Sequence, residues 1–286
     1  MSGTATTVGT INGHTELIAH IGFPTHSFKA TMIYNPWFAK AGVNAVVVPM
    51  GCKPQDFPVF LKSVFRLTNL RGALITMPHK VSTMDLLDEV LPTAAIAGAC
   101  NAVRVGPKGQ LQGDMFDGEG FVRGVLRKGL KLKGASALVV GSGGVGCAIA
   151  ASLAAAGVAR LGLFDVNPAS ADGLAARLLQ HYPRMHVRAG SNDPAGFDLV
   201  VNGTPLGMTP GDAMPMDVSR IDAQTFVGEV VMKTEMTAFL AAAKARGCRV
   251  QVGTDMLFEQ IPAYLEFFGL PSATPQELRD VATLVY

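Results

Sequence analysis

The sequence contains little cysteine and little charge, and both shortages exclude classes of protein. Only four of its 286 residues are cysteines, and they are widely spaced without a C-x-x-C pair. This pattern excludes a disulfide framework and a cysteine-ligated zinc site, and it favours a reducing compartment. Charged residues make up 16% of the chain, the net charge is +2, and lysine and arginine form no run. Nucleic acid and anionic membrane surfaces are therefore not expected partners.

A targeting segment is also missing from the beginning of the sequence. Residues 1–7 contain no basic residue and no apolar run, so we expect no signal peptide and a cytoplasmic protein. The six histidines show no ligand spacing, so no metal is expected. Residues 135–159 carry no charge and would be long enough to cross a bilayer. They include a glycine-rich loop whose backbone groups would lack partners in lipid, so burial inside a soluble protein explains them better.

This glycine loop is the most informative stretch of the sequence. An apolar segment at 137–140 predicts a buried parallel strand, and an alanine-rich segment at 147–156 before Gly157 predicts a helix and its end. The glycines between them fit G-x-G-x-x-G, which allows a tight turn, the approach of a pyrophosphate and close packing of helix on strand. The helix N-terminus offers free N–H groups to the phosphates. The predicted cofactor-binding residues of the loop are Gly141, Ser142, Gly143, Gly144, Val145 and Gly146.

A second predicted strand ends at Asp165, which Val166 follows. A carboxylate about 20 residues after the glycine loop suits the ribose hydroxyls of a dinucleotide. We therefore predict that NAD is preferred over NADP, because Asp165 would repel a 2′-phosphate and the residues after it supply no cation. Two alternatives stay open. Asp165 could simply begin the turn at Asn167, or Arg160 or Arg177 could reach the phosphate from elsewhere in the fold.

Strand-like and helix-like segments alternate along the chain, which predicts an α/β protein with parallel or mostly parallel sheets. Its length suffices for two domains. In the first part we expect strands at 17–21, 45–49, 72–76 and 102–105 and helices at 31–41, 57–69, 81–90, 93–97 and 119–129. In the second part we expect strands at 137–140, 161–164, 199–202, 226–232 and 249–252 and helices at 147–156, 237–246, 256–268 and 275–286.

Two charged residues stand where ligands gather in such sheets. Lys80 follows the predicted end of a strand, and Asp117 lies in a glycine-rich turn at the expected domain junction. A lysine facing an aspartate across a cleft would be a reasonable acid–base pair for the oxidation of an alcohol. The alternative is that each residue is a solvated surface charge.

Five spaced motifs carry a resemblance that covers nearly the whole chain. They are Thr76-x-Pro-x-Lys80, Gly98-Ala-x-Asn101, Gly113-x-x-x-Asp117-Gly-x-Gly120-Phe121, Asn202-x-Thr204-x-x-Gly207-Met208 and Gly253-x-x-Met256-Leu257-x-x-Gln260. In this order they resemble the shikimate/quinate dehydrogenase family. The resemblance implies an N-terminal α/β substrate domain and a Rossmann-type, doubly wound nucleotide-binding domain. The substrate domain would comprise residues 1–117 completed by 254–286, and the NAD-binding domain residues 118–253.

The resemblance also implies roles for individual residues. Lys80 and Asp117 would be the catalytic pair of an oxidoreductase that moves a hydride between nicotinamide and a secondary alcohol of a hydroxylated ring. The implied contacts to the substrate hydroxyls are Thr76, Asn101 and Gln260, and those near the cofactor are Gly203, Thr204, Val230 and Gly253.

The sequence departs from the family pattern at the substrate anchor. Two serines usually hold the substrate carboxylate there, and an ungapped alignment places Phe28 and Ala30 at their positions. A shift by one residue would place Ser27 and Lys29 there instead. Further usual residues are replaced by Met115, Phe116, Met232 and Thr234. Because each lost buried hydrogen bond weakens binding, we expect the best substrate not to be shikimate itself.

Two other classes of function stay open for this sequence. One is another two-domain NAD enzyme, such as a methylene-folate dehydrogenase, and the other is a non-catalytic NAD-binding regulator. The expected partner is a small-molecule substrate, and a homodimer is left open. The sequence also leaves the pathway open, whether aromatic amino acid biosynthesis or the degradation of quinate-like compounds.

Overall fold

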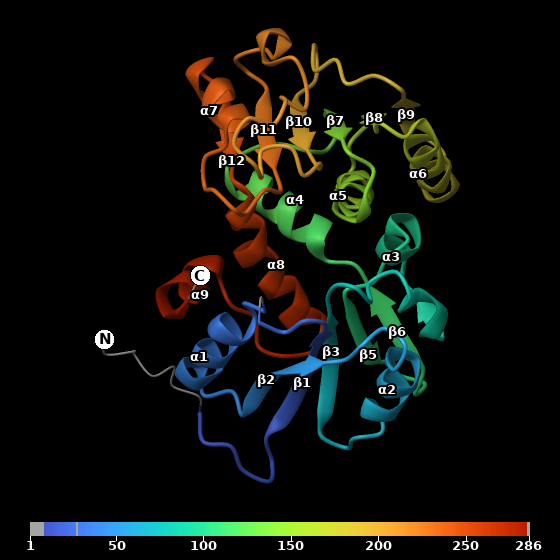
Figure 1. Ribbon diagram of the computed structural model, residues 1–286, viewed down its shortest axis with the longest axis vertical. Coiled ribbons are helices and arrows are strands. Elements are labelled where there is room, and N and C mark those ends of the chain that lie inside the picture. The colour runs from blue at the N-terminus through green and yellow to red at the C-terminus, as the bar shows by residue number, and fades with distance from the viewer. Residues whose placement is uncertain (1–8, 27, 285–286) are drawn as a thin grey trace. The chain divides into compact units, whose positions relative to one another are not determined.

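The computed structural model describes residues 9–26 and 28–284, and these residues form two compact units (Figure 1). The first unit contains the described residues up to Ala94, Ala99–Asp114 and those from Ile261 onward, and the second contains Ala95–Gly98 and Met115–Gln260. Each unit has its own six-stranded sheet. The domain boundaries drawn from the resemblance, after residues 117 and 253, stay a prediction.

The sheet of the first unit has the strand order β2-β1-β3-β5-β6-β4. Its strands are β1 (Glu16–Gly22), β2 (Ala45–Gly51), β3 (Leu70–Ile75), β4 (Glu89–Val90), β5 (Ala102–Val105) and β6 (Leu111–Asp114). β1 lies between β2 and β3 and runs parallel to both, whereas β5 is antiparallel to β3 and β6. The sequence did not predict β6. It forms a hairpin with β5 because the short turn from Gly106 to Gly109 leaves no length for a crossover.

Helix α1 (Thr31–Ala41) has the predicted bounds although it contains Pro36. It is tied to β2 by the buried side chain of Asn35, which accepts a hydrogen bond from Val47 N at 2.8 Å and donates one to Val47 O at 3.1 Å. The helix ends where Gly42 takes a positive φ of 67° and donates its N–H to Phe38 O. These bonds hold α1 in register with β2.

The helices predicted at 57–69 and 275–286 are wrong at their C-terminal ends. They are α2 (Phe57–Val64) and α9 (Pro275–Val281). The first stops early because Asn69 belongs to the sheet edge. Its carbonyl accepts from Leu17 N at 2.8 Å, and its side-chain amide donates to Thr15 O at 3.1 Å. Tertiary bonds therefore decide where α2 ends.

The helix predicted at 81–90 is wrong. This segment contains a short 3₁₀ turn (Met84–Leu86) and then β4, while α3 (Pro92–Ala97) follows as expected. The backbone before β4 is held by β6, because Asp88 N donates to Leu111 O at 2.9 Å and Leu111 N donates to the Asp88 carboxylate at 2.8 Å. Pairing with a strand that the sequence did not predict overrides the local helical pattern.

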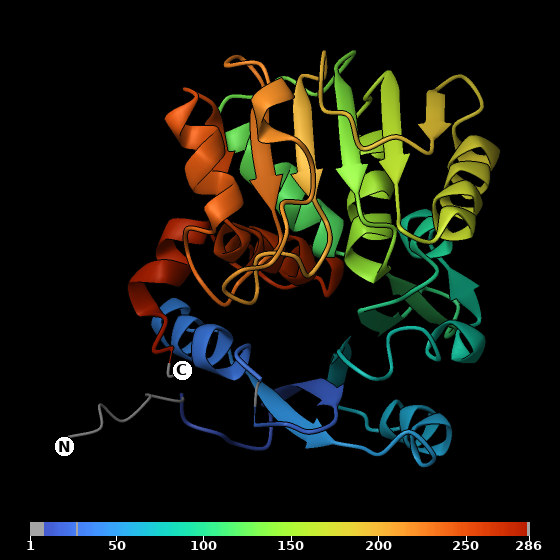
Figure 2. The same cartoon turned by 45° about the horizontal axis from the view of Figure 1, so that its top comes forward.

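The sheet of the second unit is parallel throughout, in the order β12-β11-β10-β7-β8-β9 (Figure 2). Its strands are β7 (Ser136–Val140), β8 (Arg160–Phe164), β9 (His186–Ala189), β10 (Leu199–Asn202), β11 (Phe226–Glu229) and β12 (Arg249–Gln251). From β7 the chain builds β8 and β9 on one side and then β10 to β12 on the other. The strand order therefore reverses between β7 and β10, which is the ligand-binding switch point of a doubly wound sheet.

The helices of the second unit are α4 (Asp117–Arg127), α5 (Gly144–Ala155), α6 (Pro168–His181), α7 (Ala238–Ala245) and α8 (Gly253–Phe267), of which α8 continues into the first unit. This unit has the predicted Rossmann-type fold. Among the residues that the structure describes, no helix is both long and apolar enough to cross a membrane.

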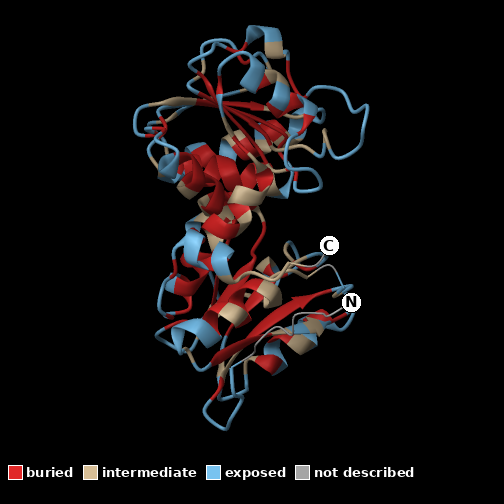
Figure 3. Cartoon of the chain, turned by 90° about the vertical axis from the view of Figure 1, so that its left-hand side faces the viewer, coloured by how far each residue is buried: buried red, intermediate tan, exposed pale blue. Residues whose placement is uncertain are grey.

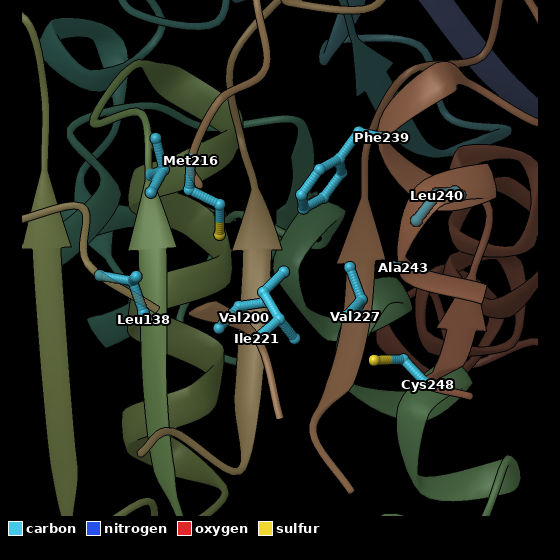
Figure 4. Close-up of a cluster of buried hydrophobic side chains, with 10 residues drawn as sticks. Leu138, Val200, Met216, Ile221, Val227, Phe239, Leu240, Ala243 and Cys248 are labelled. Carbon is cyan, nitrogen blue, oxygen red and sulfur yellow. The ribbon is translucent and has the colours of Figure 1, made fainter. Parts of the chain in front are cut away.

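Burial follows the sheets in both units, as the red strands of Figure 3 show. In the second unit one core lies against α7 (Figure 4). Leu138, Val200 and Val227, from three neighbouring strands, belong to one buried cluster with Phe239 and Leu240 of this helix, and all five are at most 2% exposed. The central strands are thereby fixed beneath the edge at which the glycine loop begins.

Candidate active site

The glycine loop lies at the switch point and is shaped by close backbone contacts. Gly141 follows β7 with a φ of 101°, and a Cβ there would lie 2.8 Å from the carbonyl carbon of Gly203. A Cβ on Gly146 would collide with the carbonyl oxygen of Gly141. The first and third glycines are therefore required for the turn and for the packing of α5 on β7, as the sequence predicts.

The middle of the loop forms an open cradle. A Cβ on Gly143 or Gly144 would have no atom within 4 Å, so nothing in the described chain fills the space above them. Helix α5 begins at Gly144, and no side chain caps its N-terminus. The Ser142 hydroxyl is buried and has no hydrogen-bond partner among the described residues. Free N–H groups, a dipole end and an unused hydroxyl suit the phosphates of a dinucleotide.

Asp165, directly after β8, braces this loop. Its carboxylate accepts a hydrogen bond from Ser142 N at 2.7 Å and another from Asn167 N at 2.9 Å. Asp165 therefore begins the turn before α6, which was the structural alternative, and also fixes the glycine loop, which the sequence did not predict. Each carboxylate oxygen can accept a further bond, so a role toward the ribose is compatible with this geometry.

Of the two arginines left open as partners of a 2′-phosphate, Arg160 is bound far from the glycine loop and Arg177 lies close to it. Arg160 begins β8, at the opposite end of this strand from Asp165, where it donates to Gly196 O and lies 4.8 Å from the Phe197 ring. Arg177 donates to Ile96 O at 2.7 Å and to Cys147 Sγ at 3.7 Å in the first turn of α5, next to the glycine loop. Val166 is 93% exposed beside Asp165 and carries no charge.

A hydrogen-bonded loop after β10 packs against the cradle from the other side of the switch point. Asn202 accepts bonds from Thr204 N at 3.1 Å and from Thr204 Oγ1 at 2.6 Å, and it donates to Leu206 O at 2.9 Å. A Cβ on Gly203 would lie 3.1 Å from the Cα of Gly146. Gly203 and Thr204 thus lie beside the glycine loop, and their place beside the cofactor stays a prediction.

A buried carboxylic acid, which the sequence analysis missed, supports this loop. Glu229 ends β11 opposite Asn202 and is 0% exposed. One of its oxygens accepts from Thr237 Oγ1 at 2.9 Å, and the other has no partner among the described residues. Burial raises the pKa of Glu229 to about 7, although its bonds with Thr237 and Asn202 act in the opposite direction. A lone acidic residue in the middle of the strand predicted at 226–232, which in fact ends at Glu229, was the available signal.

The resemblance places Gly253 and Val230 next to the nicotinamide. A Cβ on Gly253, the first residue of α8, would collide with Val231 O and would lie 2.8 Å from the carbonyl carbon of Val230. Met232, which replaces the usual tyrosine, is 47% exposed just beyond. The structure therefore brings Val230 and Gly253 together through direct backbone packing.

Asp117 and Gln260 lie near the crossing of α4 and α8. Asp117 begins α4 and is only 6% exposed. One turn later, a Cβ on Gly120 would lie 2.6 Å from both Met256 O and the Cβ of Gln260. The Gln260 side-chain oxygen is buried and lacks a partner among the described residues. Glycine at 120 is thus what allows α8 to bring Gln260 close to the start of α4.

In the first unit, three predicted site residues meet at the end of β3. Ile75 N donates to Asn101 O at 2.8 Å, next to Thr76, and Cys100 N donates to Lys80 O at 2.8 Å. Thr76 N in turn donates to Ile21 O at 2.9 Å in β1. Thr76, Lys80 and Asn101 are therefore held by one short network at this edge. Because Lys80 belongs to the first unit and Asp117 to the second, their pairing stays a prediction.

Two aromatic rings lie at the same edge, of which the sequence analysis placed Phe28 at the substrate anchor and did not place His20 in the site. Phe28 stacks on His20 with a ring separation of 4.1 Å and an angle of 27°. The positive charge of Lys80 contributes to the lowering of the His20 pKa, so Lys80 lies close enough to act on this ring. Lys29 is half-buried in the turn before α1, and Ser27 lies outside the described residues.

Known proteins resemble this chain over nearly its whole length. The family model for the shikimate dehydrogenase substrate binding domain matches residues 21–103. A shikimate dehydrogenase (NADP(+)) of Rubrobacter xylanophilus is 34% identical over 254 residues, which are 87% of this chain and 89% of that protein. The chain belongs to the shikimate/quinate dehydrogenase family. A second family model, of the ThiF family, matches residues 122–179, which run from α4 into α6 and include the glycine loop.

Solved structures of the family share both units. Shikimate 5-dehydrogenase from Listeria monocytogenes, in complex with shikimate and NAD, has a TM-score of 0.88 at 26% identity, covering 96% of this chain and 99% of that one. The ligand-free 5-ketofructose reductase of Gluconobacter sp. strain CHM43 has a TM-score of 0.84 at 26% identity, covering 94% and 100%. The predicted α/β fold class, with a substrate domain and a Rossmann-type domain, is confirmed.

Proposed function

We propose that this chain is a nicotinamide-dependent oxidoreductase that interconverts a secondary alcohol of a polyhydroxylated small molecule and the corresponding ketone. The observation that carries the proposal is the open cradle at Gly143 and Gly144, at the switch point of a parallel sheet. Membership in the shikimate/quinate dehydrogenase family supports the reaction class. The structural neighbours are named for shikimate in one case and for 5-ketofructose in another, which supports a hydroxylated substrate.

The cofactor that fits best is NAD. Asp165 places a negative charge beside the cradle, Val166 adds none of the opposite sign, and Arg160 is engaged at the other end of β8. Arg177 lies near the glycine loop, where it is held by Ile96 O and Cys147 Sγ, so the Asp165 carboxylate is the charge that we expect a 2′-phosphate to meet. The Rubrobacter relative is named for NADP(+) and the Listeria complex holds NAD, so both cofactors occur among the similar proteins.

In the proposed oxidation, Lys80 is the proton acceptor and Asp117 orients it and the substrate hydroxyl. The O–H proton passes to the Lys80 side chain while the carbinol C–H bond breaks with its electron pair. When bound, nicotinamide supplies the acceptor for that hydride. Hydroxyls elsewhere on the substrate would be held by Thr76, Asn101 and Gln260, whose unpartnered buried oxygen is a free acceptor.

The division of labour follows the resemblance. Residues 1–117 with 254–286 would bind the substrate, and residues 118–253 would bind the cofactor, with Val230 and Gly253 beside the nicotinamide and Gly203 and Thr204 beside the phosphate loop. Close packing requires glycine at position 120, against Met256 and Gln260 of α8, and at position 253, against Val230 and Val231. This packing supports the proposed arrangement.

The test is an initial-rate assay of nicotinamide reduction with shikimate, quinate and neutral cyclic polyols, each with NAD and with NADP. We expect turnover of at least one alcohol, with a higher kcat/KM for NAD. Calorimetric titration of both cofactors runs in parallel, and light scattering on the same sample tests the homodimer. Tight cofactor binding without turnover of any alcohol would favour the non-catalytic regulator. Turnover of only a methylene-folate would favour that rival.

A further inference from the structure

On the basis of the proposed function, we infer that the alcohol substrate carries no carboxylate, because Phe28 and His20 form a neutral aromatic platform at the substrate anchor. We call this pair the platform. It makes Phe28 and His20 specificity-determining residues for a neutral polyol or oxo-sugar.

The platform lies at the carboxyl edge of the first unit's sheet. His20 and Gly22 project from the same face of β1, because side chains two residues apart share a face. A Cβ on Gly22 would lie 2.8 Å from the tip of the Phe28 ring and would collide with the Thr76 side chain. Phe28 thus extends over the end of β1 toward Thr76, one of the proposed substrate contacts.

The ring of Phe28 occupies the place that the resemblance assigns to a serine. The alignment that places Phe28 there is ungapped and is anchored on Gly22, Pro24 and Asn35. Asn35 is locked to Val47 by two hydrogen bonds, and α1 begins directly after Ala30, its N-cap. Ala30 has no side-chain hydroxyl, so both serine positions lack one.

The platform offers no charge to an anion. Burial, and then the charge of Lys80, lower the pKa of His20 to about 4, so its imidazole is neutral at physiological pH. Its Nδ1 is buried and has no hydrogen-bond partner among the described residues, which gives a proton there nothing to hold it. The face of Phe28 carries the negative part of an aromatic quadrupole and repels a carboxylate. The C–H face of a neutral hydroxylated ring can instead pack on it.

The segments beside the platform are apolar as well. Phe23 N donates to Met77 O at 3.1 Å, which places these two residues next to each other just past the ends of β1 and β3. Phe23 is 46% exposed and Met77 is 75% exposed. Exposed apolar side chains that gather in one place mark a binding surface more often than a bare solvent face.

The discriminating experiment uses a matched pair of substrates. Shikimate is compared with the analogue in which a hydroxymethyl group replaces its carboxylate, so that the ring and the reacting alcohol are unchanged. We expect kcat/KM for the neutral analogue to exceed that for shikimate by about 100-fold or more, since each lost bond to a charged group is worth roughly tenfold to 100-fold.

A double variant tests the residues themselves. Phe28→Ser together with Ala30→Ser restores both hydroxyls, and serine is well tolerated at the N-cap position 30. We expect the preference for the neutral analogue to fall by at least tenfold, with the gain appearing in KM for shikimate. Ala30→Ser alone is the matched control for folding, and circular dichroism melts exclude unfolding of the double variant.

The outcomes separate this inference from the proposed function. If shikimate is turned over as well as the neutral analogue or better, the inference is wrong and the proposed function stands. Loss of that shikimate activity in Lys29→Met would then assign the anchor to Lys29. If NAD binds but neither compound nor any neutral polyol is turned over, the proposed function is wrong, and the inference that rests on it is wrong as well.

Discussion

Two regions of the molecule differ in how they are built. One is the cofactor cradle at the glycine loop, and the other is the proposed substrate edge at the ends of β1 and β3. The cradle consists of backbone, with glycines at 141 and 146 that no other residue can replace and open space above Gly143. The substrate edge consists of side chains, among them Phe28 and His20. The cradle follows the family pattern, whereas the edge departs from it.

This difference shows how such an enzyme diverges. A site made of N–H groups and a helix end constrains the sequence through sterics, so its glycines cannot change without loss of the turn. A site made of side chains can change its ligand through a few substitutions on an unchanged backbone. Burial shifts one pKa in each region, since it lowers the pKa of His20 at the substrate edge to about 4 and raises the pKa of Glu229, next to the loop beside the cradle, to about 7.

The largest effect is expected from replacing Lys80, the proposed proton acceptor at the substrate edge. Lys80→Met should lower kcat by about 10³-fold, because proton transfer by a positioned side chain is worth roughly 10²–10⁴-fold. NAD affinity, measured by calorimetry, should stay within twofold because the cradle lies in the second unit. Lys62→Met, on the exposed face of α2, is the matched control. Full activity of the Lys80 variant would remove Lys80 from the mechanism.

The next largest effect is expected from two glycine variants of the cradle, one that disturbs packing and cofactor binding and one that disturbs cofactor binding alone. Gly146→Ala places a methyl group against the carbonyl oxygen of Gly141, so both the melting temperature and NAD affinity should fall, the latter by about 100-fold. Gly143→Ala meets no atom within 4 Å and should lower NAD affinity without lowering the melting temperature. Calorimetry and thermal melts measure both quantities. Equal melting temperatures for the two variants would contradict the steric role of Gly146.

A smaller effect is expected for cofactor selectivity. Val166→Arg adds a cation beside Asp165, where the residue is 93% exposed, and should raise kcat/KM for NADP about tenfold relative to NAD. The matched control is Val59→Arg on α2, where the side chain is 73% exposed and far along the chain from the cradle. An unchanged NADP to NAD ratio would show that the 2′-position is read elsewhere.

The smallest effect concerns pH. Because the pKa of Glu229 is raised from 4.5 to about 7 in the folded protein, the native state binds this proton more tightly than the unfolded chain between these values. Stability from Glu229 is therefore greatest below about pH 4.5 and is lost as pH rises through 7. Glu229→Gln should flatten this fall, by on the order of 5 °C in melting temperature between pH 5 and 8.

His20 provides the internal comparison for that experiment. Its pKa is lowered from 6.5 to about 4, so its contribution to stability is complete above pH 6.5 and is lost as pH falls toward 4. The pH dependence of this stability contribution is opposite in sign to that of Glu229. It is the same in the wild type and in Glu229→Gln. Melts of wild type and Glu229→Gln at several pH values isolate the Glu229 contribution as a difference. Parallel curves would show that Glu229 is charged in the fold.

Much of the second unit could be predicted because local pattern and tertiary role agree there. The strand at 137–140, the glycine loop and the helix after it all occur as expected, and Gly157 takes a φ of 86° just past the end of α5. The role of Asp165 in bracing Ser142 could not be predicted, because the bond joins two strand ends that only the sheet brings together.

The first unit was harder to predict because its segments depend on distant partners. The helix expected at 81–90 gave way to pairing with β6, and the end of α2 was decided by bonds of Asn69 to residues near β1. The motifs identified Thr76, Lys80 and Asn101 but not His20, because a lone histidine on a strand carries no spacing signal.

The sequence by itself determined the fold class and the cofactor cradle, because glycine spacing and apolar periodicity act through local sterics and burial. Only the tertiary structure decided the chemistry of the substrate edge. Phe28 and His20 are eight positions apart along the chain (28 − 20), and their stacking depends on how the turn before α1 folds back over β1. The neutral state of His20 likewise depends on its burial in the folded unit, which removes the water that would stabilise its charge.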